Sequence, residues 1–221
     1  NGEDNMKLKK LIFLVTFILF FNLVKVDTLA KVNATLVVDK EIFSGEEVAV
    51  SIGLDNVSII TQDDEIDVLM LYLQYDSSKF TVPFAIETAK EAIISASAII
   101  PSENSLALGL TSEDIICKVY FNNPNVIEIQ ILYSLLNKKL DKDGEIFKLI
   151  FQAKEDAYGD CQFLIDDTRS VIQTNKVSNP QNIIDNQNAN IQVEVISKDT
   201  TINSLYVTSL GKTYYGKYVD G

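Results

Sequence analysis

Alternation of apolar and polar residues dominates the chain from residue 34 onward. Apolar side chains that recur at every second position indicate strands with one buried face. The pattern predicts strands over residues 34–39, 47–54, 65–75, 79–82, 105–111, 126–133, 146–154, 161–166, 170–173 and 191–196. Turn-forming residues, such as those at 44–46 and 142–144, separate many of these segments. Short strands at this spacing are typical of an all-β, antiparallel β-sandwich.

Two stretches do not follow the alternation. Residues 84–100 combine alanine and glutamate with β-branched residues, so both a helix and two strands fit. We favour strands, with a helical turn at residues 87–92. Residues 112–125 are expected to be irregular, and residues 177–188 are expected to form a surface loop because they are rich in Asn, Gln and Ser.

The N-terminal segment has the organisation of a secretory signal peptide. Basic residues at positions 7–10 precede an apolar run from Leu11 to Val24, and the segment ends in small residues at Ala30. A permanent membrane anchor needs about 20 apolar residues, so an uncleaved anchor is the second interpretation. We expect cleavage after Ala30 and a secreted, extracellular protein, either free or associated with the cell surface, with no membrane contact after cleavage.

Three parts follow from this pattern. Residues 1–30 comprise the signal and a few upstream residues, residues 31–197 the sandwich, and residues 198–221 a linker with the truncated start of a second β module. The middle part is long enough to bury a core of its own, whereas the last part is too short. A new strand is expected at residues 202–207.

The charge balance limits the functions that fit. The chain has 31 Asp and Glu against 19 Lys and Arg, a net charge of −12, so nucleic acid would be repelled. It has no histidine, which excludes a Ser-His-Asp triad and removes the commonest general base. No pair of acids lies in an apolar context suited to glycoside hydrolysis. We therefore expect neither catalytic residues nor a cofactor.

Two cysteines, Cys117 and Cys161, leave two interpretations open. Export permits a disulfide bond between them, but two buried free thiols fit the sequence equally well, because sequence does not place their Cα atoms. Two cysteines alone form no zinc site.

Two acidic segments are candidate calcium sites. Residues 141–144 (Asp-Lys-Asp-Gly) mimic the start of a calcium loop but lack the further oxygen ligands and the distal glutamate, so a plain turn is predicted. Asp63, Asp64, Glu65 and Asp67 offer at most a weak calcium site, and a solvated acidic loop is preferred. No metal site is therefore expected.

Two longer stretches resemble a known family. Residues 69–80 read LMLYLQYDSSKF, and residues 140–165 read LDKDGEIFKLIFQAKEDAYGDCQFLI. A strand that ends in Tyr-Asp-x-Ser-Lys-Phe, followed much later by Asp-Gly-x-x-x-x-Leu-x-Phe-x-Ala and a glycine turn, resembles the bacterial cohesin module of cellulosomes over residues 33–197. The tail INSLYVTSLG resembles the start of a cadherin-like β-sandwich repeat.

The resemblance implies a nine-stranded jelly-roll sandwich without catalytic activity. It implies that one sheet face docks a dockerin module carried by another protein, such as a polysaccharide-degrading enzyme. In that family the dockerin carries the essential calcium, so no metal is implied for this chain.

The predicted strand at residues 65–75 carries the candidate binding row. If the alternate residues from Leu69 to Tyr75 face the core, the outward row consists of Val68, Met70, Tyr72 and Gln74. In the resembled family this row lies on the dockerin-binding face. Because a solvated outer row should be polar, its apolar residues indicate either an interaction patch or coverage by residues 84–100 or 112–125.

Two other functions remain open. A carbohydrate-binding sandwich, with a polysaccharide as its ligand, would need exposed aromatic residues, for which the candidates are Tyr72, Tyr120, Phe121 and Tyr133. A structural spacer or adhesin domain would need no specific ligand. Binding tests against dockerin-bearing enzymes and polysaccharides separate the three.

Overall fold

The computed structural model describes residues 31–57, 66–133, 140, 142–174, 184–185, 189–197, 205–209 and 212–216. The expected signal peptide and the acidic residues 63–65 lie outside these ranges. Among the described residues, no helix has the length and apolar character needed to span a bilayer.

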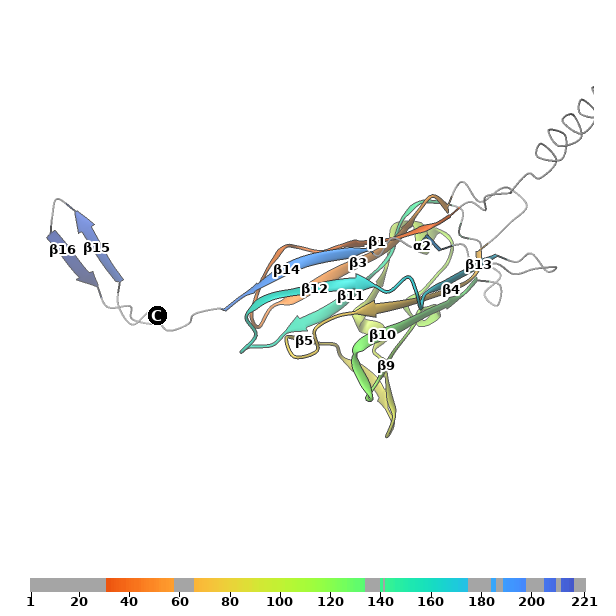
Figure 1. Cartoon of the computed structure of the whole chain (residues 1–221), viewed down its shortest axis with the longest axis horizontal. Helices are drawn as coiled ribbons and strands as arrows, with labels where there is room; N and C mark the ends of the chain where they lie inside the picture. Colours follow the sequence, from red (N-terminus) through yellow and green to blue (C-terminus); the bar gives the residue numbers. More distant parts are fainter. Residues whose placement is uncertain are drawn as a thin grey trace, which may run out of the picture. The chain divides into compact units, whose positions relative to one another are not determined.

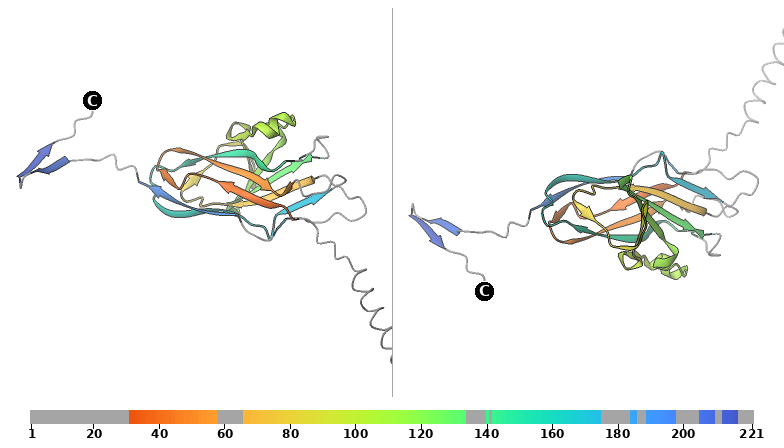
Figure 2. Two further views of the ribbon diagram at one scale, coloured as in Figure 1. Left: turned by 90° about the horizontal axis from the view of Figure 1, so that it is seen from above. Right: turned by 90° about the horizontal axis from the view of Figure 1, so that it is seen from below.

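Two sheets pack face to face in the part of the chain that the structure describes (Figure 1 and Figure 2). The β11 sheet has the order β1 (Asn33–Val37), β3 (Glu47–Asp55), β11 (Gly144–Ala153) and β5 (Phe80–Thr81), with β8 (Ile99–Pro101) also paired to β11. The β4 sheet has the order β2 (Glu41–Phe43), β14 (Asn190–Ile196), β12 (Gly159–Ile165), β4 (Ile66–Gln74), β10 (Asn123–Leu132), β9 (Ile116–Tyr120), β7 (Glu91–Ile94) and β6 (Phe84–Glu87), with β13 (Val171–Thr174) also paired to β4. All of these pairs are antiparallel except β2 with β14. The predicted all-β sandwich is confirmed, whereas the expected count of nine strands is not.

Alternating residues of β4 and β11 supply the centre of the core. Leu69, Leu71 and Leu73 of β4 have no exposed surface. The corresponding residues of β11 are Phe147, Leu149 and Phe151, which are also fully buried. Because successive side chains point to opposite faces of a strand, these positions meet between the two sheets.

Four aromatic rings join the two sheets. The ring centroid of Phe151 lies 5.2 Å from that of Tyr75, 6.2 Å from Phe80 and 5.1 Å from Phe163. Phe80 and Phe163 are also 5.2 Å apart. Tilted and edge-to-face pairs of this kind contribute about 1 kcal/mol each beyond burial. The cluster connects β5 and β11 of one sheet with β12 and the end of β4 in the other.

The segment after β8 departs from the expected strand at residues 105–111. It forms helix α2 (Glu103–Ala107), which begins at Ser102. The Ser102 Oγ accepts a hydrogen bond from the Ser105 backbone N–H at 3.2 Å, and Glu103 lies in the first turn, where its charge favours the helix dipole. The strand prediction is wrong because this local cap outweighs the alternating leucines.

Residues 84–100 form β6, β7, the short 3-10 helix η2 (Ala96–Ala98) and β8, so the prediction of strands is confirmed. The helical turn predicted at 87–92 is wrong. The Thr88 Oγ1 accepts hydrogen bonds from the backbone N–H groups of Lys90 and Glu91, which closes a hairpin between β6 and β7.

The irregular structure expected for residues 112–125 is also wrong. Helix η3 (Ser112–Asp114), strand β9 and the start of β10 occupy this segment.

The turn before β11 is stabilised by its own residues. Gly144 has a φ of 119°, a conformation that residues with a side chain rarely adopt. The Asp143 Oδ1 accepts a hydrogen bond from the Val57 backbone N–H at 2.6 Å. This carboxylate therefore ties the turn to the end of β3 and has the role of a turn residue, as predicted.

Two segments near the C-terminus complete the described structure. Ile184 forms a parallel bridge with Val32 and is 2% exposed, so the surface loop predicted at 177–188 is wrong at this residue. The rest of that loop lies mostly outside the described residues. Strand β15 (Leu205–Ser209) pairs with β16 (Lys212–Gly216) and overlaps the strand expected at 202–207.

Candidate partner-binding face

Strand pairing brings side chains from three strands together on the side of the β4 sheet that faces away from the β11 sheet. Tyr72 lies opposite Glu128, and Glu128 lies opposite Lys118. Met70 lies opposite Gln130. Directly opposed side chains share a face of the sheet. We call this surface the outer face, and it consists of Val68, Met70, Tyr72, Gln74, Lys118, Tyr120, Glu128 and Gln130.

The predicted orientation of β4 is confirmed. The residues of the outward row, Val68, Met70, Tyr72 and Gln74, are each half-buried, and the leucines between them are fully buried. The row thus places an aliphatic and a thioether side chain at the partly solvated surface of a central strand. These are groups that water does not stabilise.

The backbone of Tyr72 is held by a turn rather than by a neighbouring strand. Strands β12 and β13 both pair with β4, and the turn between them lies opposite Tyr72. The Tyr72 N–H donates to the Ser170 Oγ at 3.0 Å, and the Asp166 N–H donates to the Tyr72 carbonyl at 2.9 Å. The Ser170 hydroxyl in turn donates to the Asp166 carbonyl at 2.7 Å. Both main-chain groups of Tyr72 are therefore bonded, which fixes the backbone that carries its side chain.

The same turn places a cation on the Tyr72 ring. The Arg169 guanidinium carbon lies 4.3 Å from the ring centroid, within the range of a cation–π contact. Arg169 is the only arginine in the sequence. The arginine restricts the ring from one side and leaves a flat, positively charged group at the outer face.

A carboxylate holds the other end of Tyr72. Glu128, which is 8% exposed, accepts hydrogen bonds from the Tyr72 hydroxyl at 3.0 Å, the Gln130 amide at 2.7 Å and the Tyr120 hydroxyl at 3.5 Å. Burial raises the pKa of Tyr72 above its ordinary value of 10.0, and the bond to Glu128 adds to this rise. Burial and Glu128 also raise the pKa of Tyr120. Both tyrosines are therefore neutral hydrogen-bond donors at neutral pH.

Two residues of this arrangement, Glu128 and Arg169, were not predicted from the sequence. Each had a weak signal. Glu128 is a single acid within the apolar strand VIEIQIL, and Arg169 is unique in its residue type. Neither signal identifies Tyr72 as the partner, because 56 residues separate Tyr72 from Glu128.

No family model and no curated protein sequence matches this chain, but solved structures do. The cohesin module of a family 33 glycoside hydrolase from Clostridium perfringens is 14% identical, with a TM-score of 0.50, over 76% of this chain and 98% of that module. A chain from a complex of a CaDoc0917 variant with CaCohA2 is 20% identical, with a TM-score of 0.50, over 74% of this chain and 99% of that chain. The fold is that of a cohesin module. A type I cohesin from Pseudobacteroides cellulosolvens is also similar, at 16% identity and a TM-score of 0.48.

The cohesin-like sandwich settles whether residues 84–100 or 112–125 cover the outward row. Strands β7 and β9, which these segments supply, pair side by side with the rest of the β4 sheet and extend it. The helical parts of the two segments lie against the opposite sheet, because η2 contacts β11, and η3 contacts η2 and the β8 strand that pairs with β11. Coverage by these two segments is therefore wrong. Within this row, the Arg169 guanidinium lies over the Tyr72 ring.

The aromatic residues considered for sugar stacking do not form one platform in the cohesin-like fold. Tyr133 has no exposed surface, and burial raises its pKa. Tyr72 and Tyr120 lie on the outer face and are bonded to Glu128. Phe121, at the turn between β9 and β10, is 42% exposed. These four candidates therefore do not form one exposed stacking surface.

The two cysteines of the cohesin-like sandwich are free thiols. Cys117 lies on β9 and is fully buried, which raises its pKa, and Cys161 lies half-buried on β12. Strands β10 and β4 lie between them, so the separation is about 14 Å at the usual strand spacing. A disulfide requires Cα atoms within about 7 Å. The disulfide interpretation is therefore wrong.

Within the described ranges, no group of three or more acidic or sulfur side chains could hold a metal ion.

Proposed function

We propose that this protein is an exported, non-catalytic docking module, which binds a dockerin module of another protein through the outer face. The cohesin fold supports this proposal, as does the similarity to a chain of the complex between the CaDoc0917 variant and CaCohA2. The sequence resemblance at residues 69–80 and 140–165 points to the same class of partner. A polysaccharide-degrading enzyme that carries a dockerin is the expected binding protein.

The observation that carries the proposal is the apolar centre of the outer face. Val68 and Met70 are half-buried on β4, in the middle of the β4 sheet rather than at its edge. A sheet face that only meets water alternates to polar residues at such positions. A methionine adapts its shape to different surfaces and is frequent at binding sites.

The surroundings of Tyr72 suit it to be an anchor of the interface. Its backbone is bonded to the 166–170 turn, its hydroxyl to Glu128, and its ring to Arg169. Tyrosine and arginine are enriched among the residues that dominate binding energy. Because the ring is already fixed, docking would cost little further side-chain entropy.

The same contacts argue against catalysis at this face. The Glu128 carboxylate is already bonded to two tyrosine hydroxyls and to the Gln130 amide, and the chain has no histidine to act as a general base. Export is supported by the predicted signal between residues 7 and 30. N-terminal sequencing of secreted material that begins at Lys31 would support it, and a mature chain that retains Leu11 to Val24 would contradict it.

The proposal is tested with Met70→Asp in the secreted chain. A charge at the centre of the outer face, which docking would bury, should weaken binding to dockerin-bearing enzymes by about 100-fold, measured by calorimetry against a panel of such enzymes. Ile100→Asp is the matched control, since Ile100 is an exposed apolar residue of the opposite sheet.

The two variants should unfold at the same temperature as the parent to within a few degrees. Equal binding by Met70→Asp and Ile100→Asp would contradict the role of the outer face. Unfolding of Met70→Asp alone would instead show that this row has a structural role. A parent chain that binds no enzyme of the panel would favour a spacer.

A further inference from the structure

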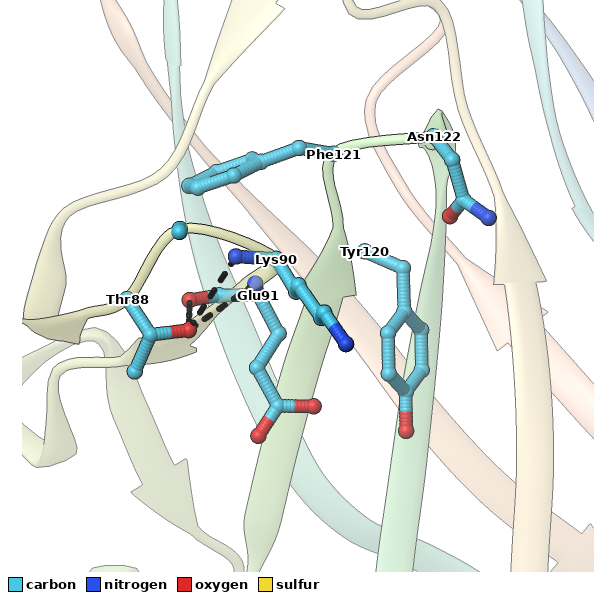
Figure 3. A pocket seen from close by; sticks show the side chains of 7 residues that line it. Thr88, Lys90, Glu91, Tyr120, Phe121 and Asn122 are labelled. Atoms are coloured by element: carbon cyan, nitrogen blue, oxygen red, sulfur yellow. Dashed lines mark hydrogen bonds between the residues drawn. The ribbon is translucent and has the colours of Figure 1, made fainter.

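A cavity lies at the end of the β4 sheet, between the β6–β7 turn and the β9–β10 turn. Its volume is about 800 Å³, within the range of small-ligand sites. The lining residues are Thr88, Ala89, Lys90, Glu91, Tyr120, Phe121 and Asn122. Figure 3 shows the Lys90 side chain between the rings of Phe121 and Tyr120.

The two turns that form the cavity are fastened internally and to each other. The Thr88 hydroxyl donates to the Glu91 carbonyl at 3.0 Å and accepts from the N–H groups of Lys90 and Glu91. The Phe121 N–H donates to the Lys90 carbonyl at 2.9 Å, which links one turn to the other. Exposed turns are commonly mobile, but these bonds hold the backbones of Phe121 and Lys90 at a fixed separation. The backbone frame of the cavity is therefore preformed.

The lining combines an aromatic face with free polar groups. Phe121 is 42% exposed although it is a large apolar residue. In the described part of the chain, the Lys90 ammonium, the Glu91 carboxylate and the Asn122 amide make no hydrogen bond or ion pair with the protein. These groups offer two kinds of donor and two kinds of acceptor around one ring. The charges of Lys90 and Glu91 cancel.

This combination fits a sugar ring. A pyranose presents apolar C–H groups on its faces, which pack on an aromatic ring, and hydroxyls at its edge, which both donate and accept hydrogen bonds. A phosphorylated ligand fits poorly, because the chain carries a net charge of −12. The balanced Lys90 and Glu91 pair favours a neutral sugar over an acidic one.

We propose that this cavity binds one pyranose unit of a neutral oligosaccharide, with Phe121 as the stacking surface and Lys90, Glu91 and Asn122 as hydrogen-bonding groups. This site is separate from the centre of the proposed docking face. Tyr120 borders both, since its hydroxyl bonds to Glu128 and its ring lines the cavity. A docking module with such a site would contact the polysaccharide on which its bound enzyme acts.

The test is an amide NMR titration of the secreted chain with cellohexaose, xylohexaose and mannohexaose. At least one of these probes should shift the signals of residues 88–91 and 120–122. Phe121→Ala should weaken that binding by at least about fivefold, whereas Phe121→Tyr, which keeps the ring, should bind nearly as the parent does. Phe43→Ala is the matched control, because Phe43 is 43% exposed at the opposite edge of the same sheet.

Two results would overturn the saccharide site: none of the three probes shifts these signals, or Phe43→Ala weakens binding as much as Phe121→Ala. The docking proposal is tested independently of this site. Met70→Asp should leave saccharide binding unchanged, and Phe121→Ala should leave enzyme docking unchanged. Loss of docking in Phe121→Ala would assign the cavity to the protein interface and reject the sugar.

Discussion

Strand β4 has nine residues, whose side chains alternate between an inner row and an outer row. The two rows have different surroundings. The inner leucines are fully buried against the opposite sheet, and their contacts are apolar. The outer residues Met70 and Tyr72 are half-buried, and Tyr72 is bonded to β10 and to the 166–170 turn. The inner row therefore stabilises the fold. On the outer row, stability requires no apolar group, and the presence of Val68 and Met70 there is the basis of the docking proposal.

The largest effect is expected on the inner row. Leu71→Ala should lower the free energy of unfolding by about 3 kcal/mol, because it opens a cavity among residues with no exposed surface. Urea denaturation measures this loss. Val37→Ala, at a position that is 65% exposed, should change stability by less than about 0.5 kcal/mol. Similar losses in the two variants would show that β4 does not form the core described here.

A second difference between the two rows concerns how the free energy of unfolding depends on pH. Burial raises the pKa of Tyr75, an inner residue, from 10.0 to about 12. The folded state then retains a proton that the unfolded state releases, so Tyr75 contributes full stability below pH 10.0 and loses it as the pH rises to about 12. The loss should reach about 2 kcal/mol.

Tyr75→Phe isolates this contribution, because phenylalanine keeps the ring and does not titrate. Denaturation of the parent and of Tyr75→Phe at a series of pH values should give curves that separate above pH 10.0, because only the parent loses this contribution there. Parallel curves would mean that another group causes the alkaline loss. The pKa of Tyr72 is also raised, and Tyr72→Phe provides the comparison on the outer row.

The smallest effect concerns Arg169. Arg169→Ala removes the cation from the Tyr72 ring and should weaken docking by about 0.5–1 kcal/mol, a few-fold in affinity. Arg169→Lys should keep part of this contribution. Lys148→Ala, which removes a cation from the opposite sheet, should leave the affinity unchanged. An Arg169→Ala variant that binds as tightly as the parent would show that the ring needs no support from the turn.

Much of the fold was predictable because residues close together in the sequence determine where its strands form. Alternation identified β3, β4 and β11, and the residues at 69–80 and 140–165 resembled a cohesin before the fold was known. The errors arose where another local signal competed. The Ser102 cap turned an alternating segment into helix α2, and the Thr88 hydroxyl closed a hairpin where alanine and glutamate suggested a helical turn.

The candidate site was predictable only in part. The orientation of Met70 and Tyr72 follows from the period of a strand. Their partners do not, because Glu128 and Arg169 reach Tyr72 through strand pairing and a turn that are distant in sequence. The cavity beside Phe121 likewise requires two turns to meet, which no single segment of the sequence indicates.

The most direct test of the proposed docking is to map the amide NMR signals of the protein when it binds a dockerin-bearing enzyme module. The signals of β4, β10 and the 166–170 turn should shift or broaden, while those of β1, β3 and β8 should stay in place. Changes confined to β1, β3 and β8 would contradict docking through the outer face.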